Sequence, residues 1–368
     1  MAETGPALAA SAIPVRNLWH LLLYAWDLAR YRDRWSAAAE EAPSLRGLLA
    51  RVLADAVADL LKRGLGRGFV PAAREVRGIR GRVDFARSLK GLSLPRGRTH
   101  CRFDELGIDT LANRILRSTL VRLARDPRLA ADAAKARGLR RDLADLAHGL
   151  DGVALVEPAP DLFSRLRIGR NDADYALAMN VCRLVHRLEM PTEERGPLAI
   201  AALLHEEILR HRLFERAILN FYRLHLGDVF DASSEMLAWP DAFACSYLPA
   251  MRTDITLRSR RKPARRIVVD AKFWEEALAA SPFGAPAFRP AHLYQIYAYL
   301  RSQDEASAAD RRASGILLYP AAGADLDEHM LVQGHRIRVA TVDLGAPWPA
   351  IEERLLDVVL HWPPPPER

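Results

Sequence analysis

Residues 251–274, MRTDITLRSRRKPARRIVVDAKFW, constrain the fold more than any other stretch of the chain. Two runs rich in apolar and β-branched residues, one after Asp254 and one before Asp270, flank a basic segment around Lys262. This pattern predicts two short β-strands joined by a charged turn. Side chains two residues apart in a strand share a face, so Asp270 and Lys272 should point the same way. If the strands pair as a hairpin, Asp254 approaches Asp270 across the ladder.

Such an arrangement suits the hydrolysis of phosphodiesters. Two carboxylates can hold Mg²⁺, a hard cation that prefers oxygen ligands, and a lysine beside them can orient or deprotonate the attacking water. A charged lysine on an otherwise apolar strand is costly unless it is paired, so Lys272 needs an explanation. The alternative is a surface salt bridge, which is the commoner meaning of a bare D-x-K pattern. The upstream Asp254 and the apolar strand count against that alternative.

Three further side chains are candidates for supporting roles. Glu215, in RLFERAILNFY, lies on the helix expected before the hairpin and could supply an extra acidic metal ligand. Gln295 and Tyr299, in LYQIYAYL, lie one helical turn apart and could contact the substrate backbone or support the lysine. A solvated helix charge is the alternative for Glu215, and a core position is the alternative for Tyr299.

The periodicity of the chain changes near its middle. The second half alternates strand and helix patterns, which predicts an α/β domain with a mixed sheet flanked by helices. In the first half, helical patterns surround short glycine-punctuated runs after residue 63, so we expect a mixed α+β domain. We place the boundary at PTEERGP, 191–197, and predict domains 1–195 and 196–368. Helices are expected at 13–31, 44–63, 104–125 (with Asp109 as N-cap), 198–225 and 292–302, and a strand at 314–320.

Composition and missing motifs restrict the class of protein. Lys and Arg outnumber Asp and Glu by 53 to 46, a net charge of +7 that favours a polyanionic partner such as DNA. No cysteine belongs to a C-x-x-C pair, and the amino-terminal residues lack the pattern of a signal peptide. We therefore expect a cytoplasmic protein with no membrane segment. No G-x-x-x-x-G-K-[ST] phosphate loop occurs, and HEEILRH at 205–211 lacks the second histidine of a zincin helix.

Several motifs resemble those of the McrC family, the nuclease subunits of McrBC-type modification-dependent restriction systems, and the likeness covers nearly the whole chain. They appear in the family's order: IPVRNLWHLLLYAWD, GIRGRVDFARSLKG, FDELGIDTLANRILRSTL, LPAMRTDITLRS, IVVDAKFW, LYQIYAYL and GILLYP. Several long motifs in one order are far more specific than D-x-K alone. The resemblance implies that the second half is an α/β/α nuclease core of the PD-(D/E)xK type.

The same resemblance assigns expected roles within the nuclease core. It matches Asp254, Asp270 and Lys272 to the nuclease triad, with Mg²⁺ as the cofactor and Mn²⁺ as an alternative. In many nucleases of this superfamily an acid from the preceding helix joins the site, and Glu215 is the matching residue. Thr253 stands where the superfamily usually has proline. We expect this departure to affect turn geometry and not metal binding.

For the first half, the resemblance implies a domain that docks on and activates a McrB-like AAA+ GTPase. That partner would recognise DNA carrying modified cytosine, above all 5-methylcytosine, and GTP would act only through it, in agreement with the missing phosphate loop. Arg80 and Arg82 on the glycine-rich segment, and Asn113 and Arg114 on the following helix, are candidate contacts. For the last two, a buried hydrogen-bonding pair is the alternative.

Two other functions remain open at this stage. One is an interaction protein that stimulates a partner NTPase and does not cut; a degenerate nuclease usually loses an acid or the lysine, whereas all three are present here. The other is a stand-alone DNA repair nuclease of the same superfamily, which would cut without any NTPase. The sequence therefore predicts a metal-dependent endonuclease subunit and leaves both alternatives to experiment.

Overall fold

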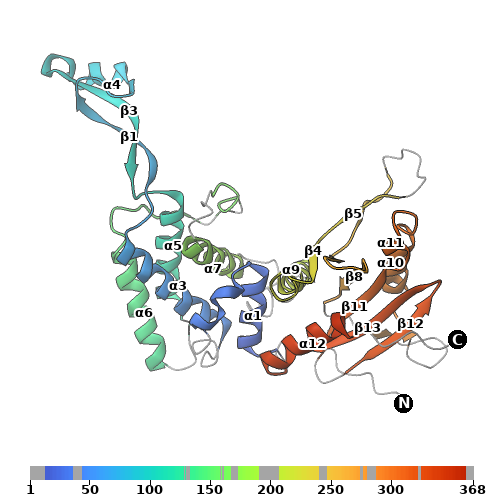
Figure 1. Cartoon of the computed structure of the whole chain (residues 1–368). Coiled ribbons are helices and arrows are strands. Elements are labelled where there is room, and N and C mark those ends of the chain that lie inside the picture. The colour runs from blue at the N-terminus through green and yellow to red at the C-terminus, as the bar shows by residue number, and fades with distance from the viewer. Residues whose placement is uncertain are drawn as a thin grey trace. The chain divides into compact units, whose positions relative to one another are not determined.

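The structure is a computed structural model of the 368-residue chain, and Figure 1 shows its helices and strands. It describes residues 13–35, 44–127, 129, 133–157, 159, 161–166, 173–189, 207–239, 247–273, 277–279, 287–321 and 325–361. The chain divides into two compact units: residues 1–42 with 196–368, and residues 43–195. We call these the first unit and the second unit.

The first unit is built on a six-stranded mixed sheet with the order β12-β13-β11-β8-β7-β4. Strands β8, β11 and β13 run parallel, while β4, β7 and β12 pair antiparallel with their neighbours. The strands of this unit are β4 (Phe230–Ser233), β5 (Met236–Leu237), β6 (Met251–Arg252), β7 (Ile255–Ser259), β8 (Arg266–Ala271), β9 (Leu278–Ala279), β10 (Ala287–Phe288), β11 (Ser314–Ala321), β12 (Asp327–Val332) and β13 (His335–Asp343). Its helices are α1 (Val15–Ala25), η2 (Ala29–Trp35), α9 (Glu207–His225), α10 (Pro290–Arg301), α11 (Ala308–Arg311) and α12 (Trp348–Leu360).

Helices cover both faces of this sheet. Every residue of β8 is buried, as expected for a central strand of a mixed sheet. Ile267 and Val269 belong to a core cluster that includes residues of α1, α9 and α12, whereas Val268 belongs to a cluster with residues of α10. Alternate residues of one strand thus face two different layers. This confirms the predicted α/β/α arrangement with a mixed sheet.

Helix α1 packs within the first unit, which differs from the predicted domain 1–195. The buried side-chain amide of Asn17 donates through Nδ2 to the carbonyls of Leu344 and Ala346, at 2.7 and 2.8 Å. Tyr222 and Phe221 of α9 lie in the same core cluster as the apolar side chains of α1. Apolar periodicity predicts a helix but does not say which partner covers it, and that is why sequence proximity misassigned this segment. The predicted boundary at 191–197 lies outside the described residues. In the division into compact units, the second unit ends at Arg195 and the second segment of the first unit begins at Gly196.

The second unit combines helices with a three-stranded antiparallel sheet, which confirms the predicted mixed α+β character. Figure 1 shows β1 (Gly68–Arg77) and β3 (Arg98–Gly107) as a long hairpin that has α4 (Phe85–Lys90) at its far end. The helices are α3 (Leu45–Arg63), α4 (Phe85–Lys90), η3 (Leu94–Arg96), α5 (Leu111–Arg125), α6 (Ala133–His148) and α7 (Ala173–Glu189). The strands are β1 (Gly68–Arg77), β2 (Arg82–Val83) and β3 (Arg98–Gly107), in the order β1-β3-β2. Among the described residues of both units, no helix has the length and apolar character needed to cross a membrane.

The start of α5 differs from the predicted helix 104–125. Residues up to Gly107 belong to β3 and pair with β1, and Thr110 is the N-cap, accepting a hydrogen bond from the backbone N–H of Asn113. Asp109, the predicted cap, instead accepts two hydrogen bonds from the Arg114 guanidinium, both at 2.7 Å. Asp and Thr are both good caps, so the choice depended on where the strand ended.

Other limits also differ from the predicted ones. α1 ends at Ala25 and not at residue 31, because Asp27 adopts a positive φ that ends the helix. The described part of α9 begins at Glu207, and residues 198–206 of the predicted helix lie outside the described residues. The predicted helix at 292–302 and strand at 314–320 correspond to α10 and β11, within two residues at their ends.

Replacing Asn17 tests whether α1 belongs to the first unit. Asn17→Ala removes the donors to Leu344 and Ala346 and leaves their carbonyls unpaired in a buried place, which should destabilise the fold by about 1–3 kcal/mol. Hydrogen exchange should accelerate in peptides of the first unit. Asn113→Ala is the matched control, because the buried Asn113 amide donates to Gly66 and Ile108 within the second unit. Faster exchange confined to the second unit in Asn17→Ala would contradict the assignment.

Candidate active site

Asp254 and Asp270 meet at one end of the β7–β8 pair. β7 and β8 pair antiparallel with Ile255 opposite Val269, so the preceding Asp254 lies level with Asp270. Asp254 Oδ2 accepts a hydrogen bond from the backbone N–H of Ala271 at 2.9 Å. Burial raises the pKa of Asp254 well above its usual range, and the negative charges of Asp270 and Glu215 raise it further. The hairpin thus brings the two carboxylates together, and the proximity of Asp270 disfavours ionisation of Asp254.

Lys272 lies beside these carboxylates. Its backbone N–H donates to Leu318 O of β11 at 2.8 Å, which continues the parallel ladder one residue beyond β8. Its side-chain Nζ is 2.8 Å from Asp270 Oδ2, and the side chain is 9% exposed. Burial acts to lower the pKa of Lys272, but the neighbouring Asp270 outweighs burial and the pKa is raised. The lysine therefore carries its positive charge at neutral pH.

Gln295 and Tyr299 of α10 extend this arrangement. Lys272 Nζ donates to Gln295 Oε1 at 2.9 Å, and Gln295 Nε2 donates to the Tyr299 hydroxyl at 2.8 Å. Tyr299 also belongs to the core cluster on this face of the sheet, and burial raises the pKa of its hydroxyl. Tyr299 thus packs in the core and also contacts Lys272 indirectly, through Gln295.

Glu215 lies on α9 and is near enough to Asp254 for its charge to raise the pKa of that carboxyl. Its side chain is 31% exposed, and its Oε1 is 3.2 Å from His211 Nδ1, one helical turn earlier. The structure therefore brings Glu215 toward the two aspartates without joining it to them by a hydrogen bond among the described residues. His211 was not singled out from the sequence, although the i, i+4 spacing of His211 and Glu215 is a recognisable signal.

The arrangement fits a divalent cation. The Asp270 carboxylate is fully buried: its Oδ2 forms an ion pair with Lys272 Nζ at 2.8 Å, and its Oδ1 has no hydrogen-bond partner among the described residues, which is unusual for a buried carboxylate. Within the described segments, no three His, Cys, Asp or Glu side chains form a preassembled ligand cluster. Mg²⁺ is commonly bound through one or two carboxylates while it keeps several waters. Two neighbouring carboxylates, and a third acid nearby, are a donor set of this kind.

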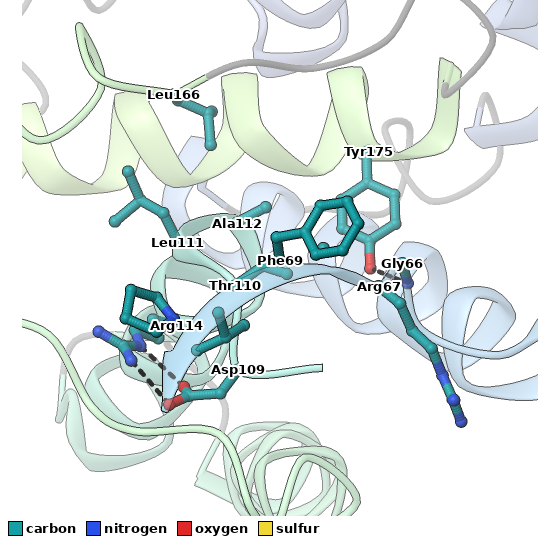
Figure 2. A pocket seen from close by; sticks show the side chains of 13 residues that line it. Gly66, Arg67, Phe69, Asp109, Thr110, Leu111, Ala112, Arg114, Leu166 and Tyr175 are labelled. Carbon is teal, nitrogen blue, oxygen red and sulfur yellow. Dashed lines mark hydrogen bonds and ion pairs between the residues drawn. The ribbon is translucent and has the colours of Figure 1, made fainter. Parts of the chain in front are cut away.

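A second hollow lies in the second unit, shown in Figure 2. This cavity of about 400 Å³ is lined mainly by residues at the start of β1 and at the start of α5. Asp109 and Arg114 on its wall are paired with each other, and the Tyr175 hydroxyl accepts from the Gly66 N–H and donates to Asn113. These polar groups are engaged in holding the fold. The cavity therefore lacks the close group of acids that distinguishes the site in the first unit.

The four candidate partner contacts divide into two kinds. Asn113 is fully buried and hydrogen-bonded within the second unit, as in its alternative interpretation, whereas the Arg114 side chain is 36% exposed and pairs with Asp109. Arg80 and Arg82 are exposed on the hairpin of the second unit. The Arg80 guanidinium lies 4.2 Å from the ring centre of Phe103. The hairpin arginines thus stay available as candidates.

Comparison with known proteins agrees with these observations. Residues 7–320 match the family model described as McrBC 5-methylcytosine restriction system component. The Type IV methyl-directed restriction enzyme EcoKMcrBC of Escherichia coli (strain K12) is 31% identical over 351 residues, which cover 94% of this chain and 97% of that protein.

A solved structure shows the same fold. It is a refined half-complex from a tetradecameric assembly of Thermococcus gammatolerans McrB AAA+ hexamers with bound McrC. The match has a TM-score of 0.52 at 17% identity and covers 96% of this chain and 78% of that one. The family match spans most of the sequence, and the E. coli relative is aligned over nearly its full length. The chain therefore belongs to the family of McrBC 5-methylcytosine restriction system components.

Proposed function

We propose that this chain is the DNA endonuclease subunit of a GTP-dependent restriction complex directed at modified cytosine, and that Asp254, Asp270 and Lys272 form its hydrolytic site. The observation that carries the proposal is the fully buried Asp270 carboxylate, which lies beside a second acid, forms an ion pair with a charged lysine through Oδ2, and has no hydrogen-bond partner for Oδ1 among the described residues. Perturbed acids next to a specific charge partner are typical of functional sites.

Asp254 and Asp270 would hold the divalent cation, Mg²⁺ or Mn²⁺, and Glu215 is a third candidate ligand. The chemistry that such a cation supplies when bound is polarisation of the scissile phosphate and acidification of a water molecule. The Ala271 N–H orients the Asp254 carboxylate by its hydrogen bond to Oδ2. Family membership supports a restriction nuclease in general terms, and the identity of the metal is part of our proposal.

Lys272 contributes charge and orientation. Held between Asp270 and Gln295, its ammonium is placed to orient the attacking water and to offset negative charge that develops on the phosphate. Gln295 and Tyr299 keep the lysine in this place through consecutive hydrogen bonds. Residues on two strands and one helix are thus combined around a single reacting phosphate.

The partner is inferred from the relatives. The E. coli relative is named a methyl-directed restriction enzyme, and the archaeal chain of the same fold is bound to McrB AAA+ hexamers. We infer that this chain likewise works with a McrB-like GTPase, which supplies GTP hydrolysis and recognises the modified DNA. The net charge of +7 suits a DNA substrate.

The second unit is the proposed docking element. Four apolar side chains of its hairpin region, Ile79, Phe85, Leu89 and Leu92, are 64–75% exposed. Exposed apolar groups that gather in one region are typical of interaction surfaces. The proposed docking domain is therefore 43–195, shorter than 1–195, because α1 belongs to the first unit.

Removing the lysine tests the hydrolytic site. Lys272→Ala should lower the rate of DNA cleavage by the assembled complex roughly 10²–10⁴-fold, because the orienting charge is lost, while stimulation of the partner GTPase stays unchanged. Cleavage of methylated plasmid with Mg²⁺ and GTP measures the first quantity. Lys262→Ala is the matched control, since Lys262 is exposed at the other end of the same hairpin.

Three results would contradict this proposal, each in a different way. Full cutting by Lys272→Ala would contradict the site, and cutting by the wild-type chain without the partner would favour a stand-alone nuclease. No cutting by the wild-type chain under any condition, with GTPase stimulation intact, would favour a non-cutting activator.

The raised pKa of Asp254 predicts a pH dependence of the metal-free protein. A carboxyl with a raised pKa in the folded state binds its proton more tightly there than in the unfolded chain. Its contribution to stability is complete below the ordinary pKa of aspartate and is lost as pH rises toward the folded value. Asp254→Asn should therefore raise the thermal midpoint in chelator-treated buffer by roughly 2–4 °C at pH 8, and less at pH 5.

Scanning calorimetry at the two pH values measures this difference. Asp231→Asn, an exposed carboxylate on β4, is the control and should change neither midpoint. A stabilisation by Asp254→Asn that is equal at pH 5 and pH 8 would show that titration of Asp254 is not its source.

A further inference from the structure

Thr253, the residue before Asp254, is fully buried and is held on its amino side by Glu235. The Thr253 N–H donates to Glu235 O at 3.0 Å, and the Glu235 N–H donates to Thr253 Oγ1 at 3.0 Å. The same hydroxyl is 3.0 Å from the hydroxyl of Thr256. One side chain thus joins three segments: the end of β6, the start of β7 and the residue before β5.

The carbonyl group of Thr253, which belongs to the peptide bond with Asp254, is also hydrogen-bonded. The Ser234 hydroxyl donates to Thr253 O at 2.6 Å. Ser234 Oγ in turn accepts from Arg252 Nε at 3.0 Å. Both backbone polar groups of Thr253 are therefore bound by Ser234 and Glu235, and the direction in which Asp254 leaves the chain is restricted.

The segment that holds Thr253 is itself anchored. Arg258 donates to both carboxylate oxygens of Glu235, at 2.7 and 3.0 Å. Arg266 of β8 has a fully buried side chain and is 3.6 Å from Glu235 and 3.2 Å from Asp310. These ion pairs attach Glu235 to the two strands that carry the aspartates.

Asp254 itself has few direct restraints. The hydrogen bond from the Ala271 N–H binds Oδ2, and this bond alone does not set the position of the Asp254 backbone. The register of β7 and β8 places Asp254 level with Asp270, and the contacts of Thr253 restrict the peptide bond that leads into Asp254. These contacts end one residue short of the reacting groups.

We propose that Thr253 is a positioning residue, whose hydroxyl, through Glu235, sets the Asp254 carboxylate for binding a divalent cation. The inference rests on the proposed function, since it takes Asp254 as a metal ligand. Groups that orient metal ligands typically change metal affinity 10- to 100-fold when they are removed. Loss of the Thr253 hydroxyl should lower the affinity for the cation. It should change neither the position of Lys272 nor the affinity for DNA.

The first test measures Mn²⁺ binding to the full-length protein by titration calorimetry. Thr253→Val, which keeps the shape but loses the hydroxyl, should weaken Mn²⁺ binding about tenfold. Thr253→Ser keeps Oγ1 and should stay within about twofold of wild type. Thr256→Val is the matched control, because it removes the neighbouring buried hydroxyl but leaves the bonds between Thr253 and Glu235.

The second test separates positioning from general loss of stability. DNA cleavage by Thr253→Val in the assembled complex should recover toward the wild-type rate as Mn²⁺ is raised, because the reacting groups are unchanged. A merely structural defect would not be rescued in this way. If Thr253→Val does not fold, Ser234→Ala removes the second contact to the same peptide and should also weaken Mn²⁺ binding.

Failure of the inference and failure of the proposed function are distinguishable. Unchanged Mn²⁺ binding by Thr253→Val, or an equal loss in Thr256→Val, would overturn the positioning role, provided that Asp270→Asn abolishes binding. If Asp270→Asn binds Mn²⁺ as wild type does, the proposed site itself is wrong and the positioning role falls with it.

Discussion

The pairing of β7 with β8 is the interaction on which the rest of the site depends. Their register places Ile255 opposite Val269 and therefore Asp254 level with Asp270. A shift of one residue would turn every side chain of β8 to the opposite layer. Ile267 and Val269 pack in the layer of α1, α9 and α12, so this shift would turn Asp270 and Lys272 together into that apolar layer and away from Gln295 of α10. Core packing thus determines where the acids lie.

The site differs from other buried ionic groups of the molecule because its acidic and basic side chains are unequal in number. In the second unit, Arg46 and Asp126 form a pair at 2.6 Å in which both side chains are 3% exposed and each charge has its opposite. At the site, Asp270 and Glu215 both lie near Asp254, and Lys272 forms an ion pair with Asp270. Excess negative charge in a poorly solvated place is unfavourable by itself. A cation would compensate that excess, and this explains why a stable core is needed to hold the acids together.

The two units present different chemistry. In the first, acidic side chains lie beside Lys272, and the ion pair between Arg266 and Glu235 connects to this site through Thr253. In the second, polar groups such as Asn113 and Tyr175 bind the fold together, while apolar side chains such as Phe85 and Leu89 lie exposed on the hairpin region. This contrast supports a catalytic role for one unit and a docking role for the other. Family membership gives both roles a common context.

The sequence by itself determined the layered α/β fold of the second half and the set Asp254, Asp270 and Lys272, because strand alternation is local and puts i and i+2 side chains on one face. It also pointed to Gln295 and Tyr299 through their helical spacing. Tertiary structure alone decided that α1 joins the first unit, since an apolar helix face does not specify its partner. It likewise decided that Thr110 and not Asp109 caps α5, and that Glu235 holds Thr253 across 18 residues of chain. Such contacts depend on long-range packing, and periodicity carries no information about them.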